Sequence, residues 1–467
     1  MAIELIAARL SLYSLPQLSQ QLSNRLRLLS SHWRDLPPRH QTMHSAIAWS
    51  CELLTEAEKS LFYRMAVFPG SFSLEVAEAV CGAGELDVFS GLESLLDKHL
   101  VNRQEDERQS RFWLFETLRE FGLEQLAAKG ELEVLQSNHA AYYAQLVGKS
   151  TGQDYALWDL ERHNLRAAFN WAIDHQDTRQ AYIFGIPFFA WERQVFEGRQ
   201  LISRALALPF TQALVSERWW VIYGAVALAL FSRDFPAAGQ LLDELGALSS
   251  LLNQKHFDFY HKFLKSLLFT GLGDFDAAVE TVSEAPDPGE IFSKGLFMMH
   301  LSVIVLQTHH YARVKELIQE AKNNYQQVDN VTQTKPYLID CASILGYTAL
   351  EEHQPDLAVE QFRQAFKLAL ELSVFPRVGT IYQGLGVVAM QSGNLEESVH
   401  WMSLAETIAK ATGLTARIML DKLQERYMKE LKDLLDPALF NAYWEDGQRL
   451  SMDQAIAFGK EHLLPNE

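Results

Sequence analysis

One spacing recurs along the second half of this chain and constrains its fold more than any other feature. Pairs of helical segments return about every forty residues. The marker is the position early in each second helix, which is small at Ala238, Ala278, Ala358 and Ser398. With position 313 included, successive markers lie 40, 35, 45 and 40 residues apart. A small residue lets the second helix approach the first, and stacked pairs bury one another in series, so the pattern predicts an α-solenoid.

The clearest copies of the repeat share a Leu-Gly pair on the first helix and a turn before the second. The best copy has Tyr382, Leu385-Gly386, Gly393-Asn394-Leu395, Ser398 and Ala405. A second copy has Leu345-Gly346-Tyr347, Pro355-Asp356, Ala358, Phe362 and Ala365, and weaker copies include Asp234-Phe235 and Gly273-Asp274-Phe275. Period and motif resemble tetratricopeptide repeats, somewhat longer than the ideal. The alternative is an α-bundle without regular repeats.

The bulk properties are those of a folded chain of two or three domains. The sequence has 467 residues and a net charge of −18, from 41 basic and 59 acidic residues. A net negative charge of this size repels a phosphate backbone, so DNA binding by this chain becomes the minority interpretation. No uninterrupted apolar run of about 18 residues appears, and we expect no membrane span. The separated cysteines Cys51, Cys81 and Cys341 and the lack of a signal peptide predict a cytoplasmic protein.

Residues 55–116 have the pattern of a winged helix, which is three helices and a two-stranded wing. Thr55-Glu56-Ala57-Glu58 is a capping box that starts the first helix. The second helix runs from Ser73 to about Cys81. β-type runs at 100–104 and 111–116 predict the wing, and the third helix has an expected buried stripe of Val88, Phe89, Leu92, Leu95 and Leu96.

Several segments, in order along the chain, resemble the bacterial STAND-type signalling ATPases (signal-transduction ATPases with numerous domains). In that family a P-loop nucleotide-binding core is followed by a small helical domain, a winged helix and tetratricopeptide-like repeats. The segments that carry the resemblance include Ala46-Ile47-Ala48-Trp49-Ser50, Phe62-Tyr63-Arg64-Met65-Ala66-Val67-Phe68, Leu118-Arg119-Glu120-Phe121, Asn164-Leu165-Arg166-Ala167-Ala168 and Phe440-Asn441-Ala442-Tyr443-Trp444. Residues 2–10, 39–43, 53–58, 72–77, 158–161 and 450–456 add to it.

The resemblance implies an all-α chain with a small β-hairpin, divided into four parts. We expect residues 1–54 to be a helical remnant of the nucleotide-binding module with a linker, and 55–136 to be the winged helix. Tetratricopeptide-like repeats follow over 137–415, and C-terminal capping helices over 416–467. The P-loop module itself has no counterpart in the sequence.

One departure from the family concerns its nucleotide-sensor position. The Met-His-Asp motif of the family's winged helix corresponds here to Leu114-Phe115-Glu116. Because Phe115 has no imidazole to contact a phosphate, the resemblance implies a degenerate sensor at this position.

No motif for catalysis, a cofactor or a metal stands out. Gly148-Lys149-Ser150 ends like a Walker A loop, but Tyr143 stands where the first glycine belongs, and the preceding segment is helical. His309-His310 lack metal-ligand spacing and are interpreted as surface or inter-helix residues. We therefore expect no enzyme activity, no cofactor and no metal.

The repeats are the expected interaction surface. The repeat register places six side chains on first helices, facing the concave side: Trp220, Tyr223, Tyr260, Phe263, Tyr347 and Gln383. An aromatic groove suits a protein, a peptide or a small apolar effector, although the same rings could belong to the solenoid core.

The sequence thus favours the non-catalytic sensor portion of a signalling protein. Its repeats would bind a protein or small-molecule signal, and its winged helix would relay that signal to an ATPase module in cis or in trans. Two alternatives stay open. One is a transcriptional regulator that binds DNA through the winged helix, and the other is a stand-alone tetratricopeptide scaffold.

Overall fold

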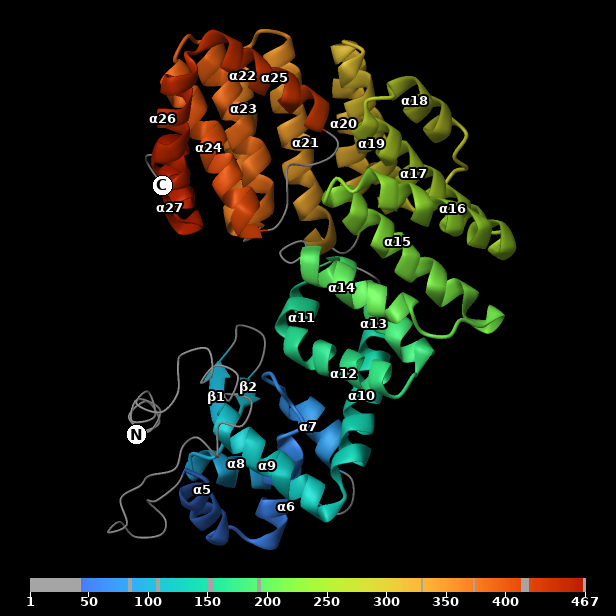
Figure 1. Cartoon of the computed structure of the whole chain (residues 1–467), viewed down its shortest axis with the longest axis vertical. Coiled ribbons are helices and arrows are strands. Elements are labelled where there is room, and N and C mark those ends of the chain that lie inside the picture. Colours follow the sequence, from blue (N-terminus) through green and yellow to red (C-terminus); the bar gives the residue numbers. More distant parts are fainter. Residues whose placement is uncertain are drawn as a thin grey trace. The chain divides into compact units, whose positions relative to one another are not determined.

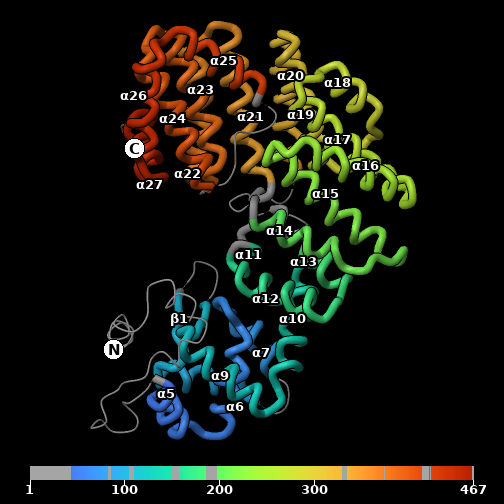
Figure 2. The backbone as a smooth tube through the Cα atoms, viewed as in Figure 1, coloured from blue at the N-terminus to red at the C-terminus, as the bar shows by residue number. Residues whose placement is uncertain are grey.

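A computed structural model describes residues 43–82, 86–105, 110–149, 155–190, 195–328, 331–372, 374–412 and 420–464 (Figures 1 and 2). The chain divides into two compact units, Met1–Phe184 and Gly185–Glu467. The segments 2–10 and 39–42, which carried part of the family resemblance, lie outside the described residues.

The first unit contains the winged helix that the sequence predicts. Helix α5 (Met43–Glu52) lies before it, within the predicted linker. The winged helix has helices α6 (Glu56–Met65), α7 (Leu74–Cys81) and α8 (Val88–Asp97), then strands β1 (Asn102–Glu105) and β2 (Ser110–Trp113) and helix α9 (Glu116–Lys129). The predicted capping box is confirmed, because Thr55 Oγ1 accepts from the Glu58 amide while the Glu58 carboxylate accepts from the Thr55 amide.

The wing is an antiparallel hairpin in which Asn102 pairs with Trp113 and Glu105 with Ser110. Outside this hairpin, Phe72 forms an isolated antiparallel bridge with Phe112 of β2. The strands are shorter than the predicted runs, since the chain enters α9 at Glu116. One position in the predicted stripe of α8 is wrong: Val88, Leu92 and Leu95 are buried and Leu96 is half-buried, but Phe89 is 60% exposed.

Four further helices complete the first unit and lead into the second. They are α10 (Leu132–Lys149), α11 (Tyr155–Leu160), α12 (Arg162–Asp174) and α13 (Thr178–Ala190). Helix α10 packs against both α7 and α12, and its side chains His139 and Tyr143 are buried beside the winged-helix core.

The second unit is an α-solenoid, as the repeat predicts. After α14 (Val195–Leu206), the described residues form successive helix pairs in which each helix packs on the next. The pairs are α15 (Val215–Phe231) with α16 (Phe235–Leu252), α17 (Lys255–Leu272) with α18 (Phe275–Ser283), α19 (Ile291–Gln307) with α20 (Tyr311–Gln326), α21 (Val331–Glu351) with α22 (Pro355–Glu371), and α23 (Val378–Gln391) with α24 (Leu395–Thr412).

The marker position of each second helix is completely buried, and the structure shifts one of the predicted markers. The buried fourth residues of these helices are Ala238, Ala278, Val314, Ala358 and Ser398. Position 313 is therefore wrong by one residue, and the intervals become 40, 36, 44 and 40. Valine fills the place of the usual small residue in α20, which fits the irregular period there.

The glycines of the Leu-Gly pairs allow the two helices of a repeat to approach closely. A Cβ atom on Gly346 would lie 2.5 Å from the ring of Phe362, and one on Gly386 would lie 3.1 Å from the Ser398 carbonyl oxygen. Only glycine allows α21 to pack this closely on α22, and α23 on α24.

One described segment, Gln212–Phe231, is long and apolar enough to cross a membrane by length and composition alone, with a mean hydropathy of 1.4. In the fold 67% of that stretch is buried, and Trp219, Ile222 and Val226 of α15 belong to the solenoid core. A buried core helix passes the same test, so the segment is weak evidence for a membrane span.

Among the described residues, three helices follow the last repeat: α25 (Asp421–Leu434), α26 (Pro437–Gln448) and α27 (Met452–Leu463). Helices α26 and α27 pack on α24. Ser403 Oγ of α24 donates to the Trp444 carbonyl (2.6 Å), and Tyr382 Oη of α23 donates to the Ala455 carbonyl (2.8 Å). The two helices therefore cover the end of the solenoid, whereas α25 returns to the repeats.

Candidate functional site

Helix α25 docks on the repeats through an apolar stripe. Leu423, Tyr427 and Leu431 recur every fourth residue and are buried in the core that the last repeats share. The Gln424 amide donates to the Tyr347 hydroxyl of α21 (3.1 Å). A short return helix of this chain therefore occupies a surface that an isolated solenoid would leave open (Figure 2).

Charged contacts at the edges hold α25 in register. The buried carboxylate of Glu351, at the end of α21, accepts from both Arg426 and Tyr427. Arg233, in the turn between α15 and α16, pairs with Glu425. Two distant repeats thus contribute to the position of α25.

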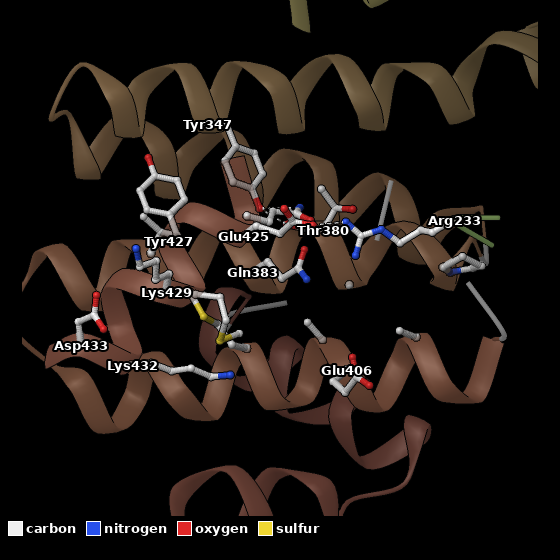
Figure 3. Close-up of a pocket in the computed structure, with 18 residues that line it drawn as sticks. Arg233, Tyr347, Thr380, Gln383, Glu406, Glu425, Tyr427, Lys429, Lys432 and Asp433 are labelled. Carbon is white, nitrogen blue, oxygen red and sulfur yellow. Dashed lines mark hydrogen bonds and ion pairs between the residues drawn. The ribbon is translucent and has the colours of Figure 1, made fainter. Parts of the chain in front are cut away.

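A pocket of about 550 Å³ lies between α25 and the helices α21, α23 and α24 (Figure 3). Its apolar lining suits a small organic molecule. The lining residues are Arg233, Tyr347, Pro376, Gly379, Thr380, Gln383, Val387, Met402, Ala405, Glu406, Ala409, Gln424, Glu425, Tyr427, Met428, Lys429, Lys432 and Asp433.

The polar lining balances opposite charges. Arg233, Lys429 and Lys432 are matched by Glu406, Glu425 and Asp433. Arg233 is already paired with Glu425. Glu406 lies 3.8 Å from Lys410, and the Lys432 ammonium lies 5.4 Å from the centroid of the Phe440 ring. The walls therefore offer charges of both signs around an apolar interior.

Two amide oxygens of the lining are buried without a hydrogen-bond donor. They are Oε1 of Gln383 on α23 and Oε1 of Gln424 on α25. A buried acceptor left unpaired costs about 1–3 kcal/mol. The interface between α23 and α25 thus leaves two buried hydrogen-bond acceptors unpaired at the pocket wall.

Two of the six predicted binding residues, Tyr347 and Gln383, line this pocket. Tyr347 is fully buried, and its hydroxyl donates to the Thr380 carbonyl (3.0 Å). Burial raises the pKa of Tyr347 well above its usual range. Its ring faces the core of α22, against Phe362, so the structure corrects its expected exposure on the concave face.

The other four predicted residues lie on α15 and α17, where three of them form an aromatic cluster. The half-buried rings of Trp220, Tyr223 and Tyr260 contact one another, with centroids 5.6–5.9 Å apart. Phe263 is buried and packs edge-on against His300 (5.4 Å), so its expected place on the groove surface is wrong. A binding role of this cluster stays a prediction.

The sensor position of the resemblance, Phe115, immediately precedes α9 as its N-cap residue. Its ring is 52% exposed and contacts Trp113 edge-on, with centroids 4.8 Å apart. No side chain caps the helix there. The assignment of Phe115 to a degenerate sensor position stays a prediction.

The remaining motifs contribute no residue to the lining of the pocket. Lys149 is the last residue of α10, and Ser150 lies outside the described residues. His309 and His310 occupy the turn between α19 and α20, where His309 Nδ1 lies 2.8 Å from the Tyr311 hydroxyl. Among the described residues no group of three or more potential metal ligands converges.

The third helix of the winged helix, α8, has an ionic contact within the domain. Lys98, the C-cap of α8, donates to Glu58 on α6 (2.6 Å). This hydrogen bond lowers the pKa of Glu58 to about 2, helped by Ser94. The positive charge of Lys98 is therefore paired with a carboxylate of the same domain.

Comparison with known proteins supports the relationship expected from the sequence. No protein-family model matches this chain. The chain is 37% identical over 191 residues to proteins of Mycobacterium tuberculosis and Mycobacterium bovis that carry the provisional name HTH-type transcriptional regulator. The match covers 39% of this chain and 22% of each relative, so this chain corresponds to about a fifth of their length.

Two further similarities complete the comparison. An uncharacterised protein of Mycobacterium tuberculosis is 31% identical over 151 residues, which are 31% of this chain and 38% of that protein. The crystal structure of a STAND protein with a tetratricopeptide repeat sensor from Pyrococcus horikoshii aligns at 14% identity and a TM-score of 0.41, over 100% of this chain and 74% of that one. The matches to the mycobacterial proteins confirm the resemblance drawn from the sequence over the part that they cover.

The contribution of α25 to the pocket could not be found from the repeat pattern. Leu420, Leu423, Tyr427 and Leu431 show that an amphipathic helix is present. Their spacing does not say which surface the helix covers.

Proposed function

We propose that this chain is the sensor and regulatory portion of a larger signalling protein. Its repeats bind a protein or small-molecule signal, and the winged helix relays the bound state to an ATPase module in cis or in trans. The observation that supports the proposal best is the pocket of about 550 Å³ at the joint between α25 and the repeats. The similarity to part of much longer mycobacterial regulators agrees with a chain that works with other domains.

The proposed coupling starts with α25. A signal bound between α23, α24 and α25 changes the free energy with which α25 docks, because only a ligand that favours one state can shift the equilibrium. Since Arg233 and Glu351 anchor α25 to different repeats, such a shift alters how those repeats are joined.

The test blocks the pocket while leaving the fold in place. Ala409 lines the pocket and is half-buried, so Ala409→Phe fills it from the rim of α24. Ala312→Phe, on the exposed face of α20, is the matched control. We expect signal-dependent ATP hydrolysis by the complex with a P-loop module to be lost in Ala409→Phe and kept in Ala312→Phe.

The chain alone should hydrolyse no ATP. Robust hydrolysis by the purified chain, abolished by one substitution, would refute the proposal. So would a signal response that Ala409→Phe leaves unchanged.

The name of the mycobacterial relatives favours DNA binding as a second candidate function. For the described residues of α8 the chemistry is unfavourable, because Asp87, Glu93 and Asp97 outnumber the single paired Lys98. Salt-dependent, sequence-selective binding of duplex DNA by this chain alone would support that candidate instead.

A further inference from the structure

The pocket brings together a cation, an anion and an amide from three different helices. Lys432 belongs to α25, Glu406 to α24 and Gln383 to α23. Figure 3 shows the ammonium, the carboxylate and the carboxamide of these residues around the same hollow. No one of these helices could present the three groups by itself.

Part of the remaining lining is apolar and adaptable. Val387, Met402, Ala405 and Met428 supply the interior surface. Methionine side chains are flexible and polarisable, and they adjust to apolar groups of different shape. The volume of about 550 Å³ lies within the range of small-molecule sites.

The two unpaired acceptors add a requirement for donors. Oε1 of Gln383 and Oε1 of Gln424 are buried without a partner, and they come from the two helices that meet at the pocket wall. A ligand ammonium or amide N–H that reaches them on a small adjustment of α25 would remove the cost of leaving them unpaired.

From these observations we infer that the pocket binds a small zwitterion with an apolar side chain, namely an α-amino acid or a dipeptide. The ligand ammonium pairs with Glu406 and with the Gln383 and Gln424 amide oxygens. The ligand carboxylate pairs with Lys432, and the apolar side chain lies against Met402 and Met428. This inference rests on the proposed sensor function, because it names the chemistry of the signal at the same site.

Compounds with a single charge are the main competitors. The net charge of −18 attracts any cation at long range, and Lys429 and Lys432 attract any anion locally. A simple amine or a simple carboxylate satisfies only one side of the pocket, whereas the zwitterion satisfies both. The preference for both charges on one molecule is therefore the property to measure.

The first experiment is calorimetric titration of the full chain at moderate salt. The probes are L-leucine, L-phenylalanine and L-phenylalanyl-L-leucine, and the comparison compounds are phenethylamine and 3-phenylpropionate. We expect at least one zwitterion to bind about tenfold or more tightly than either single-charge analogue, because each analogue lacks one charge-assisted hydrogen bond. Equal binding of analogue and zwitterion, or no binding of any zwitterion, would overturn the inference.

Variants then locate the binding. We expect each of three substitutions to lower the affinity for the zwitterion by about tenfold: Lys432→Met, Glu406→Gln and Gln383→Met. Gln361→Met is the matched control, because Gln361 on α22 also has a buried, unpaired Oε1 but does not line the pocket. Gln383→Met should not lower the unfolding temperature of the free chain, since it removes an unpaired acceptor. Unchanged affinity in all three variants would overturn the assignment.

The inference and the proposed function can fail separately. If no zwitterion binds but Ala409→Phe still abolishes the signal response, the ligand class is wrong and the sensor function stands. If zwitterions bind and Ala409→Phe blocks them without altering ATP hydrolysis by the complex, the site is real and the sensor function is wrong.

Discussion

Arg111 and Glu161 form an ion pair that is almost completely buried, with Arg111 Nη1 2.5 Å from Glu161 Oε1 and side chains 3% and 2% exposed. Arg111 lies on β2 of the wing, and Glu161 immediately precedes α12. Glu161 also accepts from the Tyr143 hydroxyl (2.8 Å) and the Asn164 amide (2.7 Å). The wing is thereby fixed to the helices that follow it within the first unit.

Arg111→Met should destabilise the first unit strongly. It leaves the Glu161 carboxylate buried without its cation, which costs about 3–5 kcal/mol. Urea unfolding followed by tryptophan fluorescence measures the loss. The exposed pair of Arg313 and Glu316 (2.8 Å) is the control, and Arg313→Met should cost at most about 1 kcal/mol. A loss below about 1 kcal/mol for Arg111→Met would contradict a structural role for the pair.

Stability of the second unit should decline with acid through His300. Burial lowers the pKa of this fully buried imidazole to about 3. His300 Nε2 lies 2.9 Å from Ser266 Oγ, whose hydrogen bond to the Ala278 carbonyl uses its own proton, so the neutral ring donates from Nε2. An unfolded histidine titrates near about 6.5.

Between these two pKa values the unfolded chain binds a proton that the folded chain does not. The free energy of unfolding is therefore unaffected by this proton above about pH 6.5. It decreases as the pH falls toward 3, by up to about 1.4 kcal/mol per pH unit. His300→Phe should remove that slope, whereas His462→Gln, at an exposed position of α27, should not. The measurement is the free energy of unfolding from chemical denaturation between pH 4 and 7. Wild type and His300→Phe with the same dependence of this free energy on pH would disprove the prediction.

Glycine substitutions should separate helix packing from helix propensity. Gly346→Ala places a Cβ atom 2.5 Å from the buried Phe362 ring and should cost about 1–3 kcal/mol by overpacking. Gly239, inside α16, has no atom within 4 Å of an added Cβ, so Gly239→Ala should gain about 0.5–1 kcal/mol. Thermal unfolding of both variants is the measurement. The same sign of shift in both would refute the close packing of α21 on α22.

Leu431→Ala should loosen α25 more than the helices around it. Leu431 is fully buried in the core shared with the last repeats, and truncation of such a side chain costs about 2–5 kcal/mol. We expect amide hydrogen exchange to rise in α25 and in the pocket residues of α23, while α27 stays protected. The exposed Leu434 at the end of the same helix supplies the control, Leu434→Ala. Uniform loss of protection across the second unit would show that α25 does not move independently.

Which residues form the candidate binding surface depends largely on contacts between distant helices, and no local sequence pattern contains these contacts. Register placed Gln383 and Tyr347 on first helices correctly, and both line the pocket. The same register could not distinguish the half-buried Tyr260 from the buried Phe263, because burial depends on which neighbouring helix covers each face. In the same way, the helical spacing of Phe89 implied a core position that the winged helix does not provide.

The amino-acid sequence by itself determined the local order of this protein. The capping box at Thr55, the Leu-Gly pairs and the buried markers such as Ala358 act over three or four residues or between adjacent helices, so they can be recognised in one dimension. Only the tertiary structure decided that α25 returns to the repeats, that Gln424 meets Tyr347, and that Arg111 pairs with Glu161. Those contacts join residues 77 and 50 positions apart, and their choice follows from the total area buried and the polar groups satisfied when all helices pack together.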